Sequence, residues 1–274
     1  MSDIKSQVWR VPAYLPYLQP PLTDQCIASA EQEIGYKLPI ELISLLRQQN
    51  GGYIRLELRD CAHRSISGIG PHFPSLTDFD WTDVQDHVSF DLQGLVPFDG
   101  DGHWFLCLDY RTDPDQPSIT LADIELGEER QLAGSFASYL GMLQLPTEGK
   151  YVLQAIPDID STKESLARSL GVSFESPQAW AHGYPTERAQ LPGRGGRNWL
   201  WISPNIVPRG FVREDHGRYD ELRSLLPGTA ERFPGLPPAS YILTATDGIL
   251  GQVLEACKQS DIPLKMLRDY YQDI

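Results

Sequence analysis

The carboxylates of one segment are the chemical feature that stands out in this sequence. Between Asp78 and Glu129 the chain holds 14 acidic residues and a single basic residue, Arg111. Most of the formal net charge of −14 lies in this part of the chain. Such a field repels phosphate backbones, and it attracts cationic proteins and speeds their association. The segment predicts a protein partner with a basic surface and no direct nucleic-acid binding. The alternative is a solvated acidic face that only favours solubility.

Metal binding is the second chemistry that carboxylates could support. In an EF-hand that begins at Asp99, Trp104 takes the place of the required glycine and Tyr110 that of the bidentate glutamate, so this site is excluded. A weaker cation site made of Asp99, Asp101 and Asp109 stays open, although a tight turn between two strands explains the same residues. The six histidines show no metal-ligand spacing. We therefore predict no metal and no cofactor.

Catalytic motifs are not found in the sequence. There is no GxSxG motif for a serine nucleophile, and the cysteines show no thiol-protease pattern. The loop Gly193–Arg197 could bind an anion through Arg194 and Arg197, but it precedes a strand and does not begin a helix. Trp199 and Trp201 share one face of that strand, which is more typical of core packing. An enzyme with a site around Arg194, Arg197 and Trp199 is thus the less favoured hypothesis.

The acidic segment must be held by the elements of an N-terminal α+β domain. Thr23 can cap a helix that Gly35 ends, and Pro39 can start a second one that stops at Asn50-Gly51-Gly52. Alternating or apolar runs predict strands, and Phe136, Leu140 and Leu143 have helical spacing. The predicted strands of this domain are 53–58, 95–98, 104–109 and 118–122, and its last predicted helix is 134–143.

The second half of the chain predicts another α+β domain. Its order of elements resembles a split βαβ arrangement. Pro146–Lys150 reads as a linker, so the predicted domains are residues 1–148 and 149–274. The expected strands are 151–156, 198–202, 211–212 and 240–245, and the expected helices are 161–170, 219–226 and 249–258.

The cysteines and the hydropathy of the sequence indicate the cellular compartment in which the protein is expected. The four cysteines show no CxxC spacing, so free thiols in a reducing cytoplasm are expected. No apolar run approaches the length of a membrane span, and the first ten residues lack the apolar core of a signal peptide. We therefore expect a cytoplasmic protein without membrane contact.

Three motifs, in order, resemble the SUKH superfamily over residues 23–145. The first consists of Glu31, Ile34-Gly35, Leu38-Pro39 and Asn50-Gly51-Gly52. The second runs from Leu95-Val-Pro-Phe through the Asp/Gly turn to Asp109, and the third is the segment 132–140 with Phe136. The likeness implies a SUKH-like mixed sheet with packed helices, and residues 149–274 lie outside it.

The resemblance also implies a function. The superfamily is largely non-enzymatic, and its bacterial members look like immunity proteins that neutralise toxins of polymorphic or contact-dependent systems. Many such toxins are nucleases with cationic faces, which an acidic domain could cover. A housekeeping scaffold or regulatory binding protein of the same fold is the competing hypothesis, distinguished by the lack of a toxin gene beside it.

Together, charge and resemblance select a set of partner-binding residues. We predict a non-catalytic protein whose acidic surface docks on a cognate toxin or another basic protein. Trp81 is the expected aromatic anchor, because tight interfaces favour buried Trp. The predicted contacts are Asp78, Asp80, Trp81, Asp83, Asp86, Asp99 and Asp101.

Overall fold

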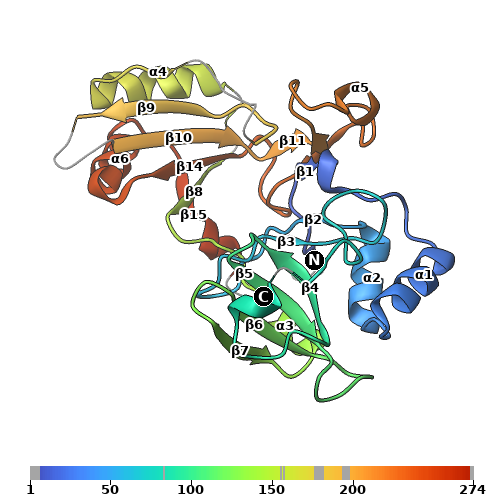
Figure 1. The fold of residues 1–274 in the computed structure, drawn as a ribbon. Helices are drawn as coiled ribbons and strands as arrows, with labels where there is room; N and C mark the ends of the chain where they lie inside the picture. The colour runs from blue at the N-terminus through green and yellow to red at the C-terminus, as the bar shows by residue number, and fades with distance from the viewer. Residues whose placement is uncertain are drawn as a thin grey trace. The chain divides into compact units, whose positions relative to one another are not determined.

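The computed structural model describes residues 7–82, 84–154, 156, 158–175, 182–192 and 198–271. The chain divides into two compact units, Val8–Pro146 and Thr147–Ile274, and Gln7 belongs to the second (Figure 1). Each unit has its own hydrophobic core. Both units combine helices with antiparallel strands, which confirms the predicted α+β class. No helix in the described part of the chain is long and apolar enough to cross a membrane.

The N-terminal unit contains three α-helices and a four-stranded sheet among its described elements. Its elements are β1 (Ala13–Tyr14), η2 (Leu15–Tyr17), α1 (Asp24–Ile34), α2 (Ile40–Gln48), β2 (Gly52–Tyr53), β3 (Ser65–Ile66), η3 (Gln85–His87), β4 (Leu95–Gly100), β5 (Trp104–Asp109), β6 (Ser118–Asp123), β7 (Glu128–Ala133) and α3 (Phe136–Met142).

The ends of α1 follow the capping rules read from the sequence. The Thr23 side chain accepts a hydrogen bond from the backbone N–H of Cys26, and Gly35 ends the helix in a left-handed conformation. Glu31 accepts a hydrogen bond from the backbone N–H of Leu38 at 3.1 Å and also pairs with Lys37. The motif glutamate therefore fixes the connection from α1 to α2, which is a structural role.

Asn50 and Gly51, which follow α2, connect this helix end to the segments around Pro20 and Gly68–Ile69. The buried Asn50 side chain donates to the carbonyls of Pro20 and Ile69 and accepts from the Ile69 N–H. Gly51 has φ +89°, and a Cβ there would lie 2.7 Å from the backbone nitrogen of Gly68. Only a residue without a side chain fits at this position.

The sheet of the N-terminal unit is an antiparallel meander in the order β4-β5-β6-β7. Both faces of β5 are covered, as its apolar sequence predicted. Leu106 and Leu108 belong to the main core together with Phe98 of β4 and Phe136 of α3. Cys107 points to the opposite face, into a smaller cluster. This outer face is the one that the acidic segment covers.

Several boundaries differ from the sequence predictions. The strand expected at 53–58 is only β2, because residues 54–57 change partners: Arg55 bonds to Val8 and Glu57 to Gln144. β4 continues through Gly100, so the expected turn at Asp99 begins at Asp101 instead. β7 was not predicted, because its sequence EERQLA lacks an apolar alternation.

The C-terminal unit is built around a five-stranded antiparallel sheet in the order β15-β8-β14-β10-β9. Its elements are β8 (Lys150–Leu153), α4 (Ile159–Leu170), β9 (Glu187–Leu191), β10 (Asn198–Pro204), β11 (Ile206–Pro208), β12 (Gly210–Phe211), α5 (Tyr219–Leu222), β13 (Thr229–Glu231), β14 (Tyr241–Ala245), α6 (Asp247–Gln259), β15 (Leu264–Met266) and η4 (Leu267–Tyr270).

The strand order reproduces the split βαβ arrangement. β8 and β10 run parallel with β14 between them, and β14 and β15 run parallel with β8 between them. Leu166 of α4 and Val253 of α6 are buried in one core with Leu200 and Leu243 of the sheet. The edge strands β9 and β15 were not predicted, and α5 is shorter than the predicted helix 219–226.

Candidate partner-binding site

The segment between β3 and β4 covers the outer face of the N-terminal sheet. Trp81, Val84, Val88 and Phe90 pack on a buried cluster of Leu92, Leu95, Cys107 and Ala122. The apolar residues of the segment therefore face the sheet, and carboxylates lie between them in the sequence. We call residues 78–94 the acidic loop.

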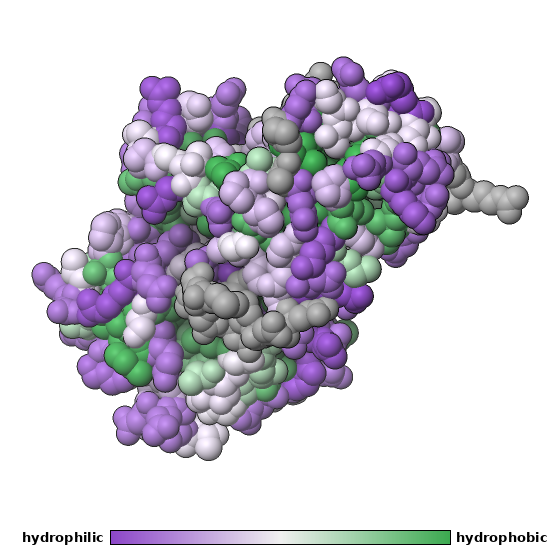
Figure 2. Space-filling view, turned by 180° about the vertical axis from the view of Figure 1, so that it is seen from behind, coloured by the Kyte–Doolittle hydropathy of each residue, from purple (hydrophilic) through white to green (hydrophobic). Residues whose placement is uncertain are grey.

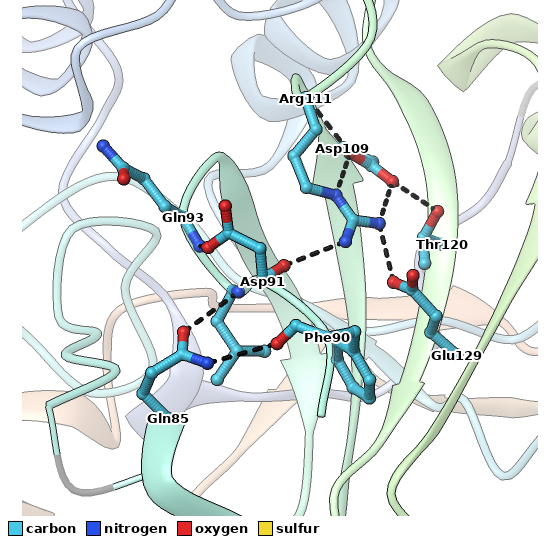
Figure 3. Close-up of polar contacts among 9 residues, drawn as sticks. Gln85, Phe90, Asp91, Gln93, Asp109, Arg111, Thr120 and Glu129 are labelled. Carbon is cyan, nitrogen blue, oxygen red and sulfur yellow. Dashed lines mark hydrogen bonds and ion pairs between the residues drawn. The ribbon is translucent and has the colours of Figure 1, made fainter. Parts of the chain in front are cut away.

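Hydrogen bonds fasten this loop to the strands. The indole N–H of Trp81 donates to the Leu95 carbonyl at 2.9 Å. The Gln85 side chain donates to the Phe90 carbonyl and accepts from the Leu92 N–H, both at 3.1 Å (Figure 3). The bonds to Leu95 and Leu92 are partly buried and the bond to Phe90 is exposed; together they fasten the described part of the loop at Trp81 and Gln85.

Arg111 closes the other end of the loop. Its guanidinium donates to Asp109 at 2.9 and 2.7 Å, to Glu129 at 2.7 Å and to the Asp91 carbonyl at 2.9 Å (Figure 3). Thr120 also donates to Asp109. The bidentate Asp109 contact raises the pKa of Arg111 above its usual value. The one cation between Asp78 and Glu129 is thus neutralised within the fold and does not offset the remaining carboxylates.

Asp78 and Asp80 lie on the surface, one on each side of Phe79 in the loop. Neither makes an ion pair with a described residue. Hydrogen bonds from the hydroxyl and the backbone N–H of Thr82 lower the pKa of Asp80. Both carboxylates are accessible to a partner, as the sequence prediction requires.

Trp81 is half-buried and already in contact with other rings. Its ring lies 4.1 Å from Phe79 and 5.2 Å from Phe105, each edge to face. The residue therefore anchors the loop on the sheet and exposes only part of its ring. Asp83 lies outside the described residues. The backbone of Asp86 is part of η3, but its side chain is also outside them.

Asp99 is a correction to the predicted set. Its side chain is only 7% exposed and accepts hydrogen bonds from His63 Nδ1 at 2.6 Å and from the Arg64 N–H at 3.0 Å. His63 in turn contacts the hydroxyl of Tyr139 through Nε2. Because the carboxylate is enclosed by these groups, Asp99 cannot meet a partner. Asp101 is exposed and caps the β4–β5 turn through the His103 N–H.

The alternative cation site is contradicted by the register of β4 and β5. Asp99 pairs with Leu106 and Asp109 pairs with Leu95, so these two carboxylates lie toward opposite ends of the hairpin. They cannot share an ion with Asp101. Among the residues described, no group of three or more His, Cys, Asp or Glu is arranged to hold a metal.

The remaining acidic residues do not form one continuous face. In a meander, alternate turns lie at opposite ends of the sheet. Asp101 and Glu128 flank turns at one end, whereas Asp113 and Asp115 lie in the β5–β6 turn at the other. Figure 2 shows that apolar residues reach the surface of one face of the molecule in separate patches bordered by hydrophilic residues. A docking surface must therefore be local, and the acidic loop is the part that adjoins a cleft.

This cleft, of about 490 Å³, opens between the end of α1, the start of the acidic loop and the start of β4. Tyr36 and Glu33 line one side, and Thr77, Phe79 and Trp81 line the other. Glu33 and Tyr36 were missed in the sequence, where Tyr36 reads only as part of the connection after Gly35. In the sequence, the cleft is signalled only on the side of the acidic loop, where Thr77, Phe79 and Trp81, which line it, alternate with Asp78 and Asp80.

The second half of the chain offers little geometry for the enzyme hypothesis. Trp199 and Trp201 share one face of β10, away from the helix-covered core, and Arg188 lies over the Trp199 ring at 4.6 Å. Arg188 also pairs with Glu175, so its charge is compensated. The loop Gly193–Arg197, with both candidate anion-binding arginines, lies outside the described residues.

A comparison with known protein families finds a match for the N-terminal unit. Residues 21–142 match the SMI1 / KNR4 family (SUKH-1), which confirms the resemblance inferred from the three motifs. The matched region contains α1 to α3, the four-stranded sheet, the acidic loop and the cleft. Comparison with curated proteins gave no significant match.

Proposed function

We propose that this chain is an immunity protein of a bacterial polymorphic or contact-dependent toxin system, because residues 21–142 match the SMI1/KNR4 (SUKH-1) family, which includes immunity proteins. It acts in the cytoplasm and without catalysis. It neutralises its cognate toxin by covering a basic surface of that toxin. The family match is the observation that carries the proposal.

The acidic loop supports this function in two ways. Asp78 and Asp80 are exposed and make no ion pair with described residues, whereas Arg111, the one Lys or Arg between Asp78 and Glu129, is bound by Asp109 and Glu129. The loop is also fastened at Trp81 and Gln85, so the backbone that carries Asp78 and Asp80 is held in place before a partner arrives. Preorganised charge of this kind favours fast and selective association with a cationic surface.

Co-expression with a toxin encoded beside its gene tests the proposal. The wild-type chain is expected to restore growth and to co-purify with the toxin. The double variant Asp78→Lys/Asp80→Lys is expected to protect less at equal expression, because two attractive charges become repulsive. Glu164→Lys/Glu255→Lys is the matched control, since both residues are exposed on helices of the C-terminal unit and the charge change is the same. A wild-type chain that neither protects nor co-purifies contradicts the proposal.

A further inference from the structure

The cleft beside the acidic loop has two aromatic walls, and each wall is supported from behind. On one side the Phe79 and Trp81 rings lie edge to face with each other and with Phe105, at 4.9 and 5.2 Å. On the other side Tyr36 stacks on Tyr110, with ring centroids 4.3 Å apart and planes within 10°. The rings are therefore held in place without a ligand.

The rim of the cleft is acidic and lacks a compensating cation. Glu33 lines the cleft, is exposed and makes no ion pair with a described residue. Along the opposite wall, Thr77, Phe79 and Trp81 line the cleft, and Asp78 and Asp80 alternate with them on the surface. No Lys or Arg is found among the described residues that line it.

A neighbouring cleft shows why the charge matters. It shares Gly35 and Tyr36 with the first, but it is lined by Lys37 and by Glu31, which form an ion pair. Asp115 also lines this second cleft, but the ammonium group of Lys37 lies there and weakens the attraction for another cation. The cleft at Phe79 and Trp81 combines aromatic faces with one carboxylate, Glu33, that makes no ion pair with a described residue, and a guanidinium group prefers such an environment. Its volume also lies in the range of about 300–1,000 Å³ that is typical of ligand sites.

We propose that this cleft binds an arginine side chain from an extended basic segment of the partner. The side chain enters the cleft beside Tyr36, Phe79 and Trp81, stacks its planar guanidinium on these rings and donates hydrogen bonds to Glu33. Asp78 and Asp80 do not line the cleft, and their exposed carboxylates add attraction from the neighbouring surface. Lysine is disfavoured, because its compact ammonium group is strongly hydrated and cannot stack. The inference deepens the proposed function and rests on it for the identity of the partner, a toxin.

Peptide binding to the full-length chain tests the site. A capped hexa-arginine peptide is titrated into the isotopically labelled protein, with hexa-lysine and the uncharged hexa-citrulline as comparisons. The arginine peptide is expected to shift the Trp81 indole N–H and the backbone signals of residues 33–36 and 77–81 in a saturable manner. Hexa-citrulline is expected to leave them unchanged.

Two variants separate a specific site from general attraction to an acidic protein. Glu33→Gln is expected to weaken hexa-arginine binding about fivefold, whereas Glu164→Gln, on α4, changes it by less than about twofold. Phe79→Leu keeps the apolar bulk but removes the ring, so the preference for arginine over lysine should fall. Equal binding by Glu33→Gln and Glu164→Gln, or signal shifts centred on the hairpin turns, would overturn the inference.

The two proposals fail in different ways. If the chain still protects against the toxin but the peptide signals lie outside the cleft, the arginine site is wrong and the immunity function stands. If the peptide binds the cleft but no neighbouring toxin is neutralised, the site stands and its assignment to a toxin is wrong.

Discussion

His63 lies fully buried between two residues that are distant from it in sequence, Asp99 and Tyr139. Burial raises the pKa of Asp99, but the hydrogen bond and charge of His63, together with bonds from Ser65 and the Arg64 N–H, lower it below its usual value overall. A carboxyl group with a lowered folded-state pKa stabilises the fold above its unfolded pKa of about 3.9 and loses that contribution as the pH falls through the folded value. Asp99 thus holds β4 to the segment that carries His63.

We predict that Asp99→Asn lowers the unfolding free energy of the N-terminal unit by about 3 kcal/mol at pH 7, because an amide cannot replace the carboxylate that accepts hydrogen bonds from His63, Ser65 and the Arg64 N–H. The difference from wild type should shrink as the pH drops below about 4. Urea denaturation followed through the amide signals of β5 measures the effect over pH. Asp101→Asn, at an exposed turn, is the control and should change stability by less than about 0.5 kcal/mol. A loss that does not depend on pH contradicts the assigned role of the Asp99 charge.

Arg111 shows why a count of charges did not describe the surface. In the sequence it is the one cation among 14 carboxylates. In the structure it is only 23% exposed and holds Asp109, Glu129 and the Asp91 carbonyl together. Burial raises the pKa of Asp109, but the hydrogen bonds of Arg111 and Thr120 lower it below its usual value overall. Arg111 and its two carboxylate partners therefore stabilise the fold, and the charge available for the proposed docking comes from the other carboxylates.

At the scale of the elements, the SUKH motifs are explained by backbone geometry. Gly35 and Gly51 both have positive φ, +84° and +89°. At Gly35 a Cβ would meet nothing within 4 Å, whereas at Gly51 it would lie 2.7 Å from Gly68 N and 3.0 Å from its Cα. Both positions therefore require a left-handed backbone conformation, but only Gly51 also lacks the space for a Cβ atom.

We therefore predict that Gly51→Ala destabilises the N-terminal unit by more than about 2 kcal/mol, since it adds a backbone clash to the cost of a left-handed residue. Gly35→Ala should cost only about 1 kcal/mol. Urea denaturation of both variants measures the difference. Equal losses at the two positions would show that conformation alone, and not close approach to Gly68, determines the requirement for glycine.

Local rules were enough for the helices and the central strands of the N-terminal unit. Thr23 and Gly35 specify the two ends of α1 by capping, and the apolar run Trp104–Asp109 specifies the buried strand β5. Each of these signals lies within a few residues of the element that it specifies. β7 and the breaks after Tyr53 depend on partners far along the chain, such as Val8 and Gln144 for residues 55 and 57. Tertiary pairing of this kind leaves no periodic signal in the sequence.

The candidate site was predictable only in part for the same reason. Asp78, Asp80 and Trp81 lie together in the sequence, so charge and residue type identified them. The opposite wall of the cleft, Glu33 and Tyr36, comes from the end of α1 and meets the loop only in the fold. The burial of Asp99 likewise depends on His63 and Tyr139, which no spacing rule connects to it.

At the scale of the whole molecule, the two units carry different parts of the protein's properties. The family match, the acidic loop and the cleft belong to the N-terminal unit. The C-terminal unit is a split βαβ fold whose described ion pairs, such as Lys163 with Glu187 and Arg188 with Glu175, largely balance its charge. Recognition of a basic partner by charge is therefore expected from the N-terminal unit, within the full chain.

The association rate of the chain with its cognate toxin tests this central claim most directly. At low ionic strength we predict that Asp78→Lys/Asp80→Lys slows association about tenfold or more, and that Glu164→Lys/Glu255→Lys slows it much less although it changes the net charge equally. At about 1 M salt the difference between the two variants should nearly vanish, because the Debye length falls to about 3 Å. Equal rates for the two variants at low salt would contradict a local docking surface on the acidic loop.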